Sequence, residues 1–243
     1  MSPAAPVLVV IADSLSFHGP ERAEPADEPR LWPHVAARGV GGRAELHAGL
    51  GWTARHAWRA MVGDPRIWAS LRHADAVVLG VGGMDTLPSP VPTALRELIP
   101  AVRSARLRRV MRGAHGWLTP RVARGLGRAG PVALPPAETV RHLERLRGAV
   151  STLIPGLPVV AMLPSVHRSA FYGGVHAGRD RHVTAMTAWA RAHDVPLVDP
   201  APLVAAHVLG GHGNPDGIHW GWEAHEAVGN AVGRAVGTAL TSR

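Results

Sequence analysis

The stretch Val7-Leu8-Val9-Val10-Ile11-Ala12-Asp13-Ser14 decides the fold. Residues 7–12 form an unbroken apolar run, which is typical of a strand covered by helices on both faces of a parallel sheet. The run ends in an Asp-Ser pair, and ligands bind at the carboxyl ends of strands in open α/β sheets. It therefore predicts a parallel α/β sheet with Ser14 at the ligand-binding edge, although an Asp-Ser pair here is also a common helix cap.

Outward from this strand, short apolar runs alternate with stretches of helical period along the chain. The apolar runs predict four more strands, at 43–47, 76–81, 158–163 and 195–199. The helical period predicts helices at 31–38, 53–61, 65–71, 93–99, 138–152, 179–193 and 222–240. This alternation indicates a single α/β domain over residues 1–243, a three-layer α/β/α sandwich on a flavodoxin-like, five-stranded parallel sheet.

The connection between the third and fourth predicted strands is longer than one crossover helix requires. Residues 101–135 within it carry eight arginines and no acidic residue. These arginines are Arg103, Arg106, Arg108, Arg109, Arg112, Arg121, Arg124 and Arg128. Apolar residues recur beside them at helical spacing, so we predict an amphipathic, lid-like helical insertion at about 101–135. Its cationic face either holds an anionic group of a substrate or is a solvated surface.

The composition rules out several kinds of chemistry. The 243 residues include no cysteine and no lysine, which excludes disulfides, cysteine nucleophiles and Schiff-base lysines. A net charge of +8 suits small anionic substrates or nucleic acid. Because the arginines concentrate beside an apolar stripe, without an aromatic-rich RNA-binding pattern, we expect no nucleic-acid partner. The 15 histidines lack metal-ligand spacing, so we expect no metal site.

The sequence also bears on location. No apolar run approaches the roughly 18 residues of a membrane-spanning helix. The first residues lack the basic region of a signal peptide. We therefore expect a cytoplasmic protein without a membrane span, and the oligomeric state stays open.

A second polar motif, Asp216-Gly217-Ile218-His219, stands directly before the last predicted helix. At this spacing the carboxylate can orient one imidazole nitrogen, which leaves the other nitrogen free to take a proton from a hydroxyl. An isolated Asp-x-x-His motif is common by chance, so its weight depends on what accompanies it.

The ordered set of motifs resembles the SGNH/GDSL hydrolase superfamily. The set consists of Asp13-Ser14-Leu15, Gly49-Leu50-Gly51-Trp52, Gly82-Gly83-Met84-Asp85 and Asp216-Gly217-Ile218-His219. The resemblance implies the SGNH hydrolase fold, with Ser14 as nucleophile, His219 as general base and acid, and Asp216 as the partner that orients His219. Asp13 is expected to tie its loop by hydrogen bonds rather than to take part in catalysis.

The resemblance also implies an oxyanion hole. In the superfamily it combines the serine N–H, a glycine N–H and an asparagine side chain, which gives roles here to Ser14 and Gly51. Met84 stands in place of the asparagine, and methionine donates no hydrogen bond. Loss of one such donor typically costs about 2.7–4 kcal/mol of transition-state stabilisation. We expect the N–H groups of Gly82 and Gly83 to substitute, since glycine lets the backbone approach a ligand closely.

Further stretches are similar to the mycobacterial diglucosylglycerate octanoyltransferases. They are Gly51-Trp52-Thr53, Pro92-Thr93-Ala94-Leu95-Arg96-Glu97-Leu98, Leu163-Pro164-Ser165-Val166-His167 and Asp216-Gly217-Ile218-His219-Trp220, together with the Gly-Gly-Met-Asp block. This resemblance implies transfer of an octanoyl group from octanoyl-CoA, as a substrate and with no cofactor, to a glucose hydroxyl of (di)glucosylglycerate. The reaction belongs to methylglucose lipopolysaccharide biosynthesis. An SGNH-type carbohydrate esterase or lipase is the alternative.

Six residues near the motifs are candidates for substrate binding. They are Trp52, Met84, Asp85, His167, Trp220 and Trp222. Tryptophan can stack on a sugar ring or line an acyl pocket, although it more often serves packing. His167 follows the fourth predicted strand and is expected on the side of the ligand-binding crevice.

Overall fold

A computed structural model of the protein describes residues 5–90 and 105–242, so the helix expected at 93–99 lies outside the described residues. Five parallel strands form one sheet in the order β2-β1-β3-β4-β5. Their bounds are β1 Val7–Asp13, β2 Arg43–Gly49, β3 Ala76–Gly80, β4 Val159–Met162 and β5 Leu197–Val198. The flavodoxin-like, five-stranded sheet expected from the sequence is confirmed.

Strand β1 lies inside the sheet, between β2 and β3, and all seven of its residues are buried. Successive side chains point to opposite faces of a strand. Val9 and Ile11 pack into the core on one face of the sheet, and Leu8 and Val10 pack into the core on the other. A strand with two buried faces has to be apolar at every position, which accounts for the unbroken run in the sequence.

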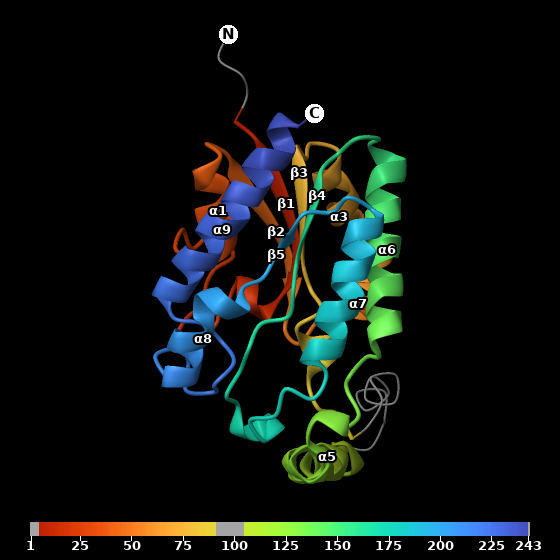
Figure 1. Ribbon diagram of the computed structural model, residues 1–243, viewed down its shortest axis with the longest axis vertical. Helices are drawn as coiled ribbons and strands as arrows, with labels where there is room; N and C mark the ends of the chain where they lie inside the picture. Colours follow the sequence, from red (N-terminus) through yellow and green to blue (C-terminus); the bar gives the residue numbers. More distant parts are fainter. Residues whose placement is uncertain (1–4, 91–104, 243) are drawn as a thin grey trace.

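Helices cover both faces of the sheet, which gives three layers (Figure 1). One face is covered by α2 Ala54–Gly63, α3 Pro65–Leu71, α6 Pro136–Leu153 and α7 Arg179–Ala192. The other face is covered by α1 Trp32–Gly39, α8 Ala201–Gly210 and α9 Trp222–Thr241. Helices α1 and α9 meet closely, because Gly229 of α9 lies directly against Val35 and the carbonyl of Trp32.

Helix α8 is absent from the sequence expectations. Its residues are apolar at nearly every position, so no helical period separates the buried Val204 and Val208 from the exposed Leu203 and Leu209. A left-handed Gly211, with φ of 87°, ends the helix. The fifth strand is also shorter than expected, two residues long at the sheet edge, because the chain turns into α8 directly after it.

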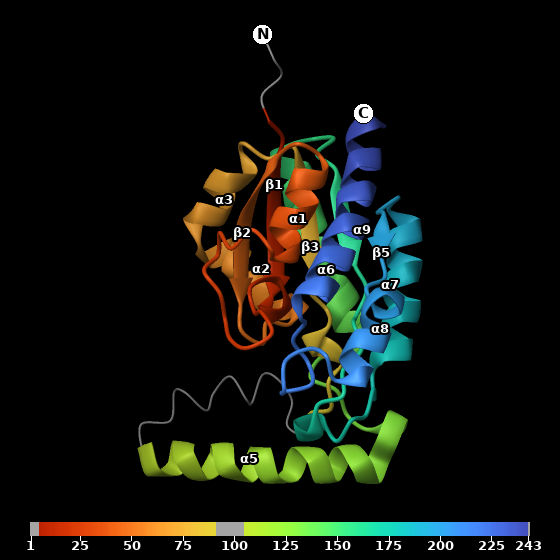
Figure 2. The same cartoon turned by 90° about the vertical axis from the view of Figure 1, so that its left-hand side faces the viewer.

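Helix α5, Ala105–Leu126, lies beyond the carboxyl ends of the strands and runs across them (Figure 2). It is followed by the 3-10 turn η4, Gly127–Ala129, and packs against η5, Ala170–Tyr172. Gly116 approaches Phe171, and Gly173 approaches Ala123. A helix is thus present within the predicted insertion, and its function as a lid stays a prediction.

Candidate active site

Ser14 begins a 3-10 turn, η1 Ser14–Ser16, where β1 ends. The carboxylate of Asp13 accepts a hydrogen bond from the Leu15 N–H at 3.0 Å, and the Ser16 hydroxyl donates to the Asp13 carbonyl at 2.6 Å. Asp13 therefore caps the turn, as the sequence suggested, and the turn brings the Ser14 side chain to the edge of the sheet. Ser14 itself is 3% exposed.

His219 is held by a compact loop before α9. The Asn214 side chain accepts from the Asp216 N–H at 3.0 Å, and the Asn214 N–H donates to the His219 carbonyl at 3.0 Å. Gly217 has φ of 74°, and a Cβ atom there would lie 2.9 Å from backbone atoms of Arg168 and Ser169. The glycine in Asp-Gly-Ile-His is thus required by both its conformation and its close approach to the 168–169 backbone.

The structure brings Ser14, Asp216 and His219 together. His219 Nε2 lies 2.9 Å from Ser14 Oγ, and His219 Nδ1 lies 2.5 Å from Asp216 Oδ2. The carboxylate fixes the proton on Nδ1, so the lone pair of Nε2 faces the serine hydroxyl. The second Asp216 oxygen accepts the N–H groups of Ile218 and His219 at 2.8 and 3.1 Å. This arrangement can remove the Ser14 proton as a nucleophile forms.

The two carboxylates near His219 differ in protonation. Burial alone would raise the pKa of Asp216, but hydrogen bonds from the His219 side chain and from two backbone amides outweigh it and lower the pKa to about 2. Burial raises the pKa of Asp13 to about 7, and the Leu15 amide and His219 only partly oppose it. Asp216 is consequently the charged partner of the histidine at neutral pH, while Asp13 serves the turn.

A second histidine lies flat against His219. The ring centroids of His18 and His219 are 3.8 Å apart, and the ring planes differ by 17°. The sequence reasoning missed His18, because nothing in its spacing separates it from the other histidines. Its position four residues after Ser14 is the one signal that points to the site.

The glycines predicted for the oxyanion hole differ in their surroundings. Gly51 lies beside Met84, whose Cε atom is 3.8 Å from where a Gly51 Cβ would stand. Gly83 approaches the Asp13 carboxylate. Gly82, with φ of 112°, instead packs against Met186. Of the three, Gly83 borders the Ser14 turn through Asp13, and Gly51 borders Met84.

Asp85 does not face a substrate. It is fully buried, and its carboxylate accepts the Ala54 N–H at 3.0 Å and the Thr139 hydroxyl at 2.7 Å. Burial raises its pKa to about 6, against the lowering effect of these hydrogen bonds. The expectation of substrate contact is corrected, because Asp85 ties the 3-10 turn η2, Met84–Thr86, to the start of α2 and to α6.

Met84 and His167 share a narrow cavity beside the Ser14 turn. Its lining is mainly apolar and includes Leu15, Met84, Leu87, Val166, His167 and Ile218. His167 is buried and packs edge-on against His176 and Tyr172. Burial lowers the pKa of His167 to about 4, so this wall of the cavity is uncharged at neutral pH.

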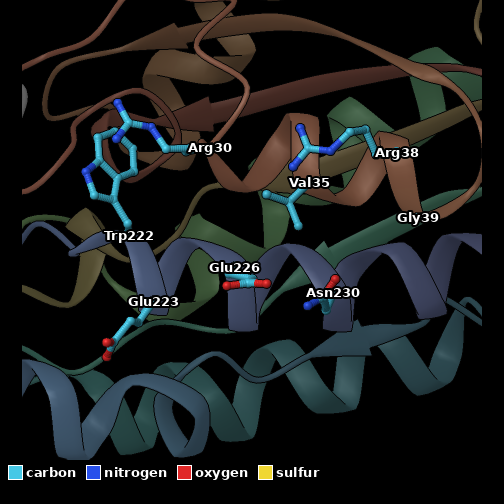
Figure 3. A pocket seen from close by; sticks show the side chains of 8 residues that line it. All are labelled: Arg30, Val35, Arg38, Gly39, Trp222, Glu223, Glu226 and Asn230. Carbon is cyan, nitrogen blue, oxygen red and sulfur yellow. The ribbon is translucent and has the colours of Figure 1, made fainter.

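The three tryptophans near the motifs lie apart from one another. Trp220 is buried in the core against α9 and borders a small cavity with Asp13 and Leu15. Trp52 lines a separate hollow beside α3. Trp222 lines a groove between α1 and α9, with Arg30 stacked 3.9 Å above its ring (Figure 3). Neither hollow includes Ser14, Asp216 or His219, and Trp222 also lies close to Gly19 and His225. Substrate contact by Trp52 and Trp222 stays a prediction.

Among residues 5–90 and 105–242, no group of three or more histidine, aspartate or glutamate side chains is placed to hold a metal ion. No helix in the same residues is both long and apolar enough to cross a membrane. Of the predicted arginine cluster, the described side chains of Arg121 and Arg124 are exposed, and Arg121 stacks on Trp117. The side chains at 103–112 and 128 lie outside the described residues.

Two curated relatives match nearly the whole chain. A diglucosylglycerate octanoyltransferase of Mycolicibacterium hassiacum is 50% identical over 242 residues, covering 98% of each chain. One of Mycobacterium tuberculosis is 48% identical over 234 residues, covering 96% of this chain and 93% of the relative. The chain belongs to the diglucosylglycerate octanoyltransferase family. No family model matches the chain.

Solved structures match the fold of this octanoyltransferase family member. A lipase/acylhydrolase from Enterococcus faecalis superposes with a TM-score of 0.62 at 13% identity, covering 96% of both chains. A carbohydrate acetylesterase family member from Sinorhizobium meliloti superposes with a TM-score of 0.61 at 16% identity, covering 97% of this chain and 99% of that one. A GDSL-family protein from Desulfitobacterium hafniense also matches, with a TM-score of 0.57. The chain thus has the SGNH/GDSL hydrolase fold predicted from the sequence.

Proposed function

We propose that this protein is a serine-dependent octanoyltransferase, which moves an octanoyl group from octanoyl-CoA to a glucose hydroxyl of (di)glucosylglycerate. The observation that carries the proposal is the contact chain Ser14–His219–Asp216, in a chain about half identical to relatives named diglucosylglycerate octanoyltransferase. The proposed chemistry uses these side chains and the two substrates, without a cofactor. We place the reaction in the cytoplasm.

In the first step Ser14 Oγ attacks the thioester carbonyl. His219 Nε2 takes the hydroxyl proton, and Asp216 stabilises the imidazolium that forms. The carbon–sulfur bond then breaks, and His219 gives the proton to the departing coenzyme A sulfur. The products are free coenzyme A and an octanoyl ester on Ser14. The N–H groups of Ser14, Gly51, Gly82 and Gly83 are the proposed donors to the oxyanion.

In the second step the sugar hydroxyl replaces the sulfur. His219 Nε2 takes its proton, the sugar oxygen attacks the acyl carbonyl, and the bond from that carbon to Ser14 Oγ breaks. The proton returns to Ser14, which restores the resting site. Water can perform the same attack, so a transferase has to orient the acceptor and limit access of water to the ester.

The apolar residues beside the Ser14 turn support an acyl substrate, and the cavity that they line, about 20 Å³ in volume, has to widen to admit an octanoyl chain. Its walls at Leu15, Met84, Leu87, Val166 and Ile218 are apolar, and an alkyl chain gains about 0.8 kcal/mol for each CH₂ group that it buries. An acyl substrate would also explain why methionine stands at position 84. It adds flexible apolar surface at a point where the resemblance leads one to expect a polar asparagine.

The proposal is tested by following octanoyl-CoA in the presence and absence of glucosylglycerate. We expect octanoylated sugar as the main product when the acceptor is present, and slow release of octanoate without it. Ser14→Ala should abolish both reactions. Equal hydrolysis with and without the acceptor, and no acylated sugar, would instead establish the esterase or lipase alternative.

A further inference from the structure

Hydrogen bonds on both sides of His18 hold it in the stack on His219. His18 Nδ1 donates to the Gly19 carbonyl at 3.0 Å, and the His18 carbonyl accepts from His225 Nε2 at 3.1 Å. The first contact ties the His18 ring to its neighbouring backbone, and the second fixes the orientation of the 18–19 peptide. The ring of His18 is therefore held in place by its own backbone and by α9.

His225 anchors this arrangement from the core. It is fully buried, and its Nδ1 accepts the Trp32 N–H at 3.2 Å, so the ring proton is on Nε2 and points to the His18 carbonyl. Burial lowers the pKa of His225 to about 4, which keeps the ring neutral at neutral pH. A neutral imidazole in this tautomer can accept at one nitrogen and donate at the other, as both contacts require.

The stack covers one face of a ring whose two nitrogens are already engaged. His219 is 7% exposed, whereas His18 is partly exposed. His18 therefore covers one face of the His219 ring and is itself partly exposed to solvent. Removal of the His18 ring would uncover that face of the imidazole and leave the hydrogen bonds at its two nitrogens.

We propose that His18 is a positioning residue that also favours acyl transfer over hydrolysis. Its ring keeps the plane of His219 aligned with Ser14 Oγ, and it keeps water away from the general base while the sugar hydroxyl is activated. The positioning part rests on geometry alone. The preference for transfer rests on the proposed octanoyltransferase function.

Three variants test the proposal. His18→Ala removes the stack, and His18→Phe restores a flat ring without imidazole nitrogens. His34→Ala is the matched control, because His34 also bonds a backbone carbonyl, that of Ala26, but lies outside the triad contacts. The first readout is the rate at which Ser14 reacts with a fluorophosphonate, which requires the His219 base but neither substrate. The second is the ratio of octanoylated sugar to octanoate.

A stacked ring pair of this kind is expected to change rates by roughly two- to tenfold. We expect His18→Ala to slow Ser14 labelling and to lower the transfer ratio by that factor, with an unchanged melting temperature. His18→Phe should recover most of the labelling rate and most of the transfer ratio, and His34→Ala should match the wild type in both quantities. Wild-type labelling of His18→Ala, or His18→Phe as impaired as His18→Ala, would overturn the positioning role.

The two readouts separate the inference from the proposed function. If the wild type labels at Ser14 but makes no octanoylated sugar, the proposed function fails while the labelling series still decides the positioning role. If the wild type transfers the octanoyl group to the sugar and His18→Ala leaves the transfer ratio unchanged, the preference for transfer is overturned and the octanoyltransferase assignment stands.

Discussion

At the scale of single residues, the orientation of His219 depends on Asp216. Asp216→Asn can donate to Nδ1 and so favour the tautomer that carries the proton on Nε2, which cannot accept from Ser14. We expect turnover to fall by about 10³–10⁴-fold with little change in KM. Steady-state kinetics with octanoyl-CoA test this, with the melting temperature as a check on folding. Turnover within a factor of a few of wild type would contradict the role given to Asp216.

The buried carboxyl of Asp13 makes stability depend on pH. Its folded pKa of about 7 lies above the ordinary value of 3.8. Between these pH values the folded protein keeps a proton that the unfolded chain has lost, so this group lowers stability as pH rises. Asp13→Asn keeps an acceptor for the Leu15 N–H but removes the titration.

We therefore expect Asp13→Asn to gain stability relative to wild type between pH 5 and pH 8, on the order of 2–3 kcal/mol. Urea unfolding at both pH values measures the difference, and the comparison at pH 5 serves as the internal control. A difference between variant and wild type that does not change with pH would show that Asp13 is ionised throughout.

At the scale of elements, the contact of α1 with α9 depends on one glycine. A Cβ atom at Gly229 would lie 2.4 Å from Val35 Cβ, whereas one at Gly237 would lie 3.6 Å from Val40 Cγ1. Gly229→Ala should lower the free energy of unfolding by about 1–3 kcal/mol through overpacking. Gly237→Ala in the same helix should leave it unchanged or raise it by up to about 1 kcal/mol through helix propensity. Denaturant unfolding of both variants measures this, and equal effects would refute the close contact.

The elements also show what sequence can predict. The buried strand 7–13 and the helix 65–71 could be predicted because an apolar run and a helical period, respectively, stand in their own residues. Both elements lie where expected. Helix α8 could not be predicted, because nearly all of its residues are apolar and no helical period is visible. In the site, Asp216 and His219 are three residues apart on one loop and could be recognised together. The stack of His18, and the burial of Asp85 against Ala54 and Thr139, arise from contacts across the fold that no local pattern records.

At the scale of the whole molecule, the net charge of +8 should assist binding of the anionic donor. Raising salt from about 0.05 M to about 0.5 M shortens the Debye length about threefold. We expect KM for octanoyl-CoA to rise on the order of three- to tenfold with little change in turnover, and that for an uncharged octanoyl ester to stay constant.

We expect the arginines of α5 to account for part of this salt dependence of KM. A variant with Arg121→Gln and Arg124→Gln should weaken the salt dependence, whereas Arg234→Gln on α9, also exposed, should not. If KM for octanoyl-CoA is unaffected by salt and by both variants, the positive charge has no part in donor binding.

The covalent step at Ser14 is the central claim, and the mass of the intact protein tests it most directly. Brief exposure to octanoyl-CoA should add one octanoyl group to the wild-type protein, and the added mass should disappear when glucosylglycerate follows. Ser14→Ala should stay unmodified. An octanoyl group that forms equally on Ser14→Ala, or sugar octanoylation by that variant at the wild-type rate, would contradict the account.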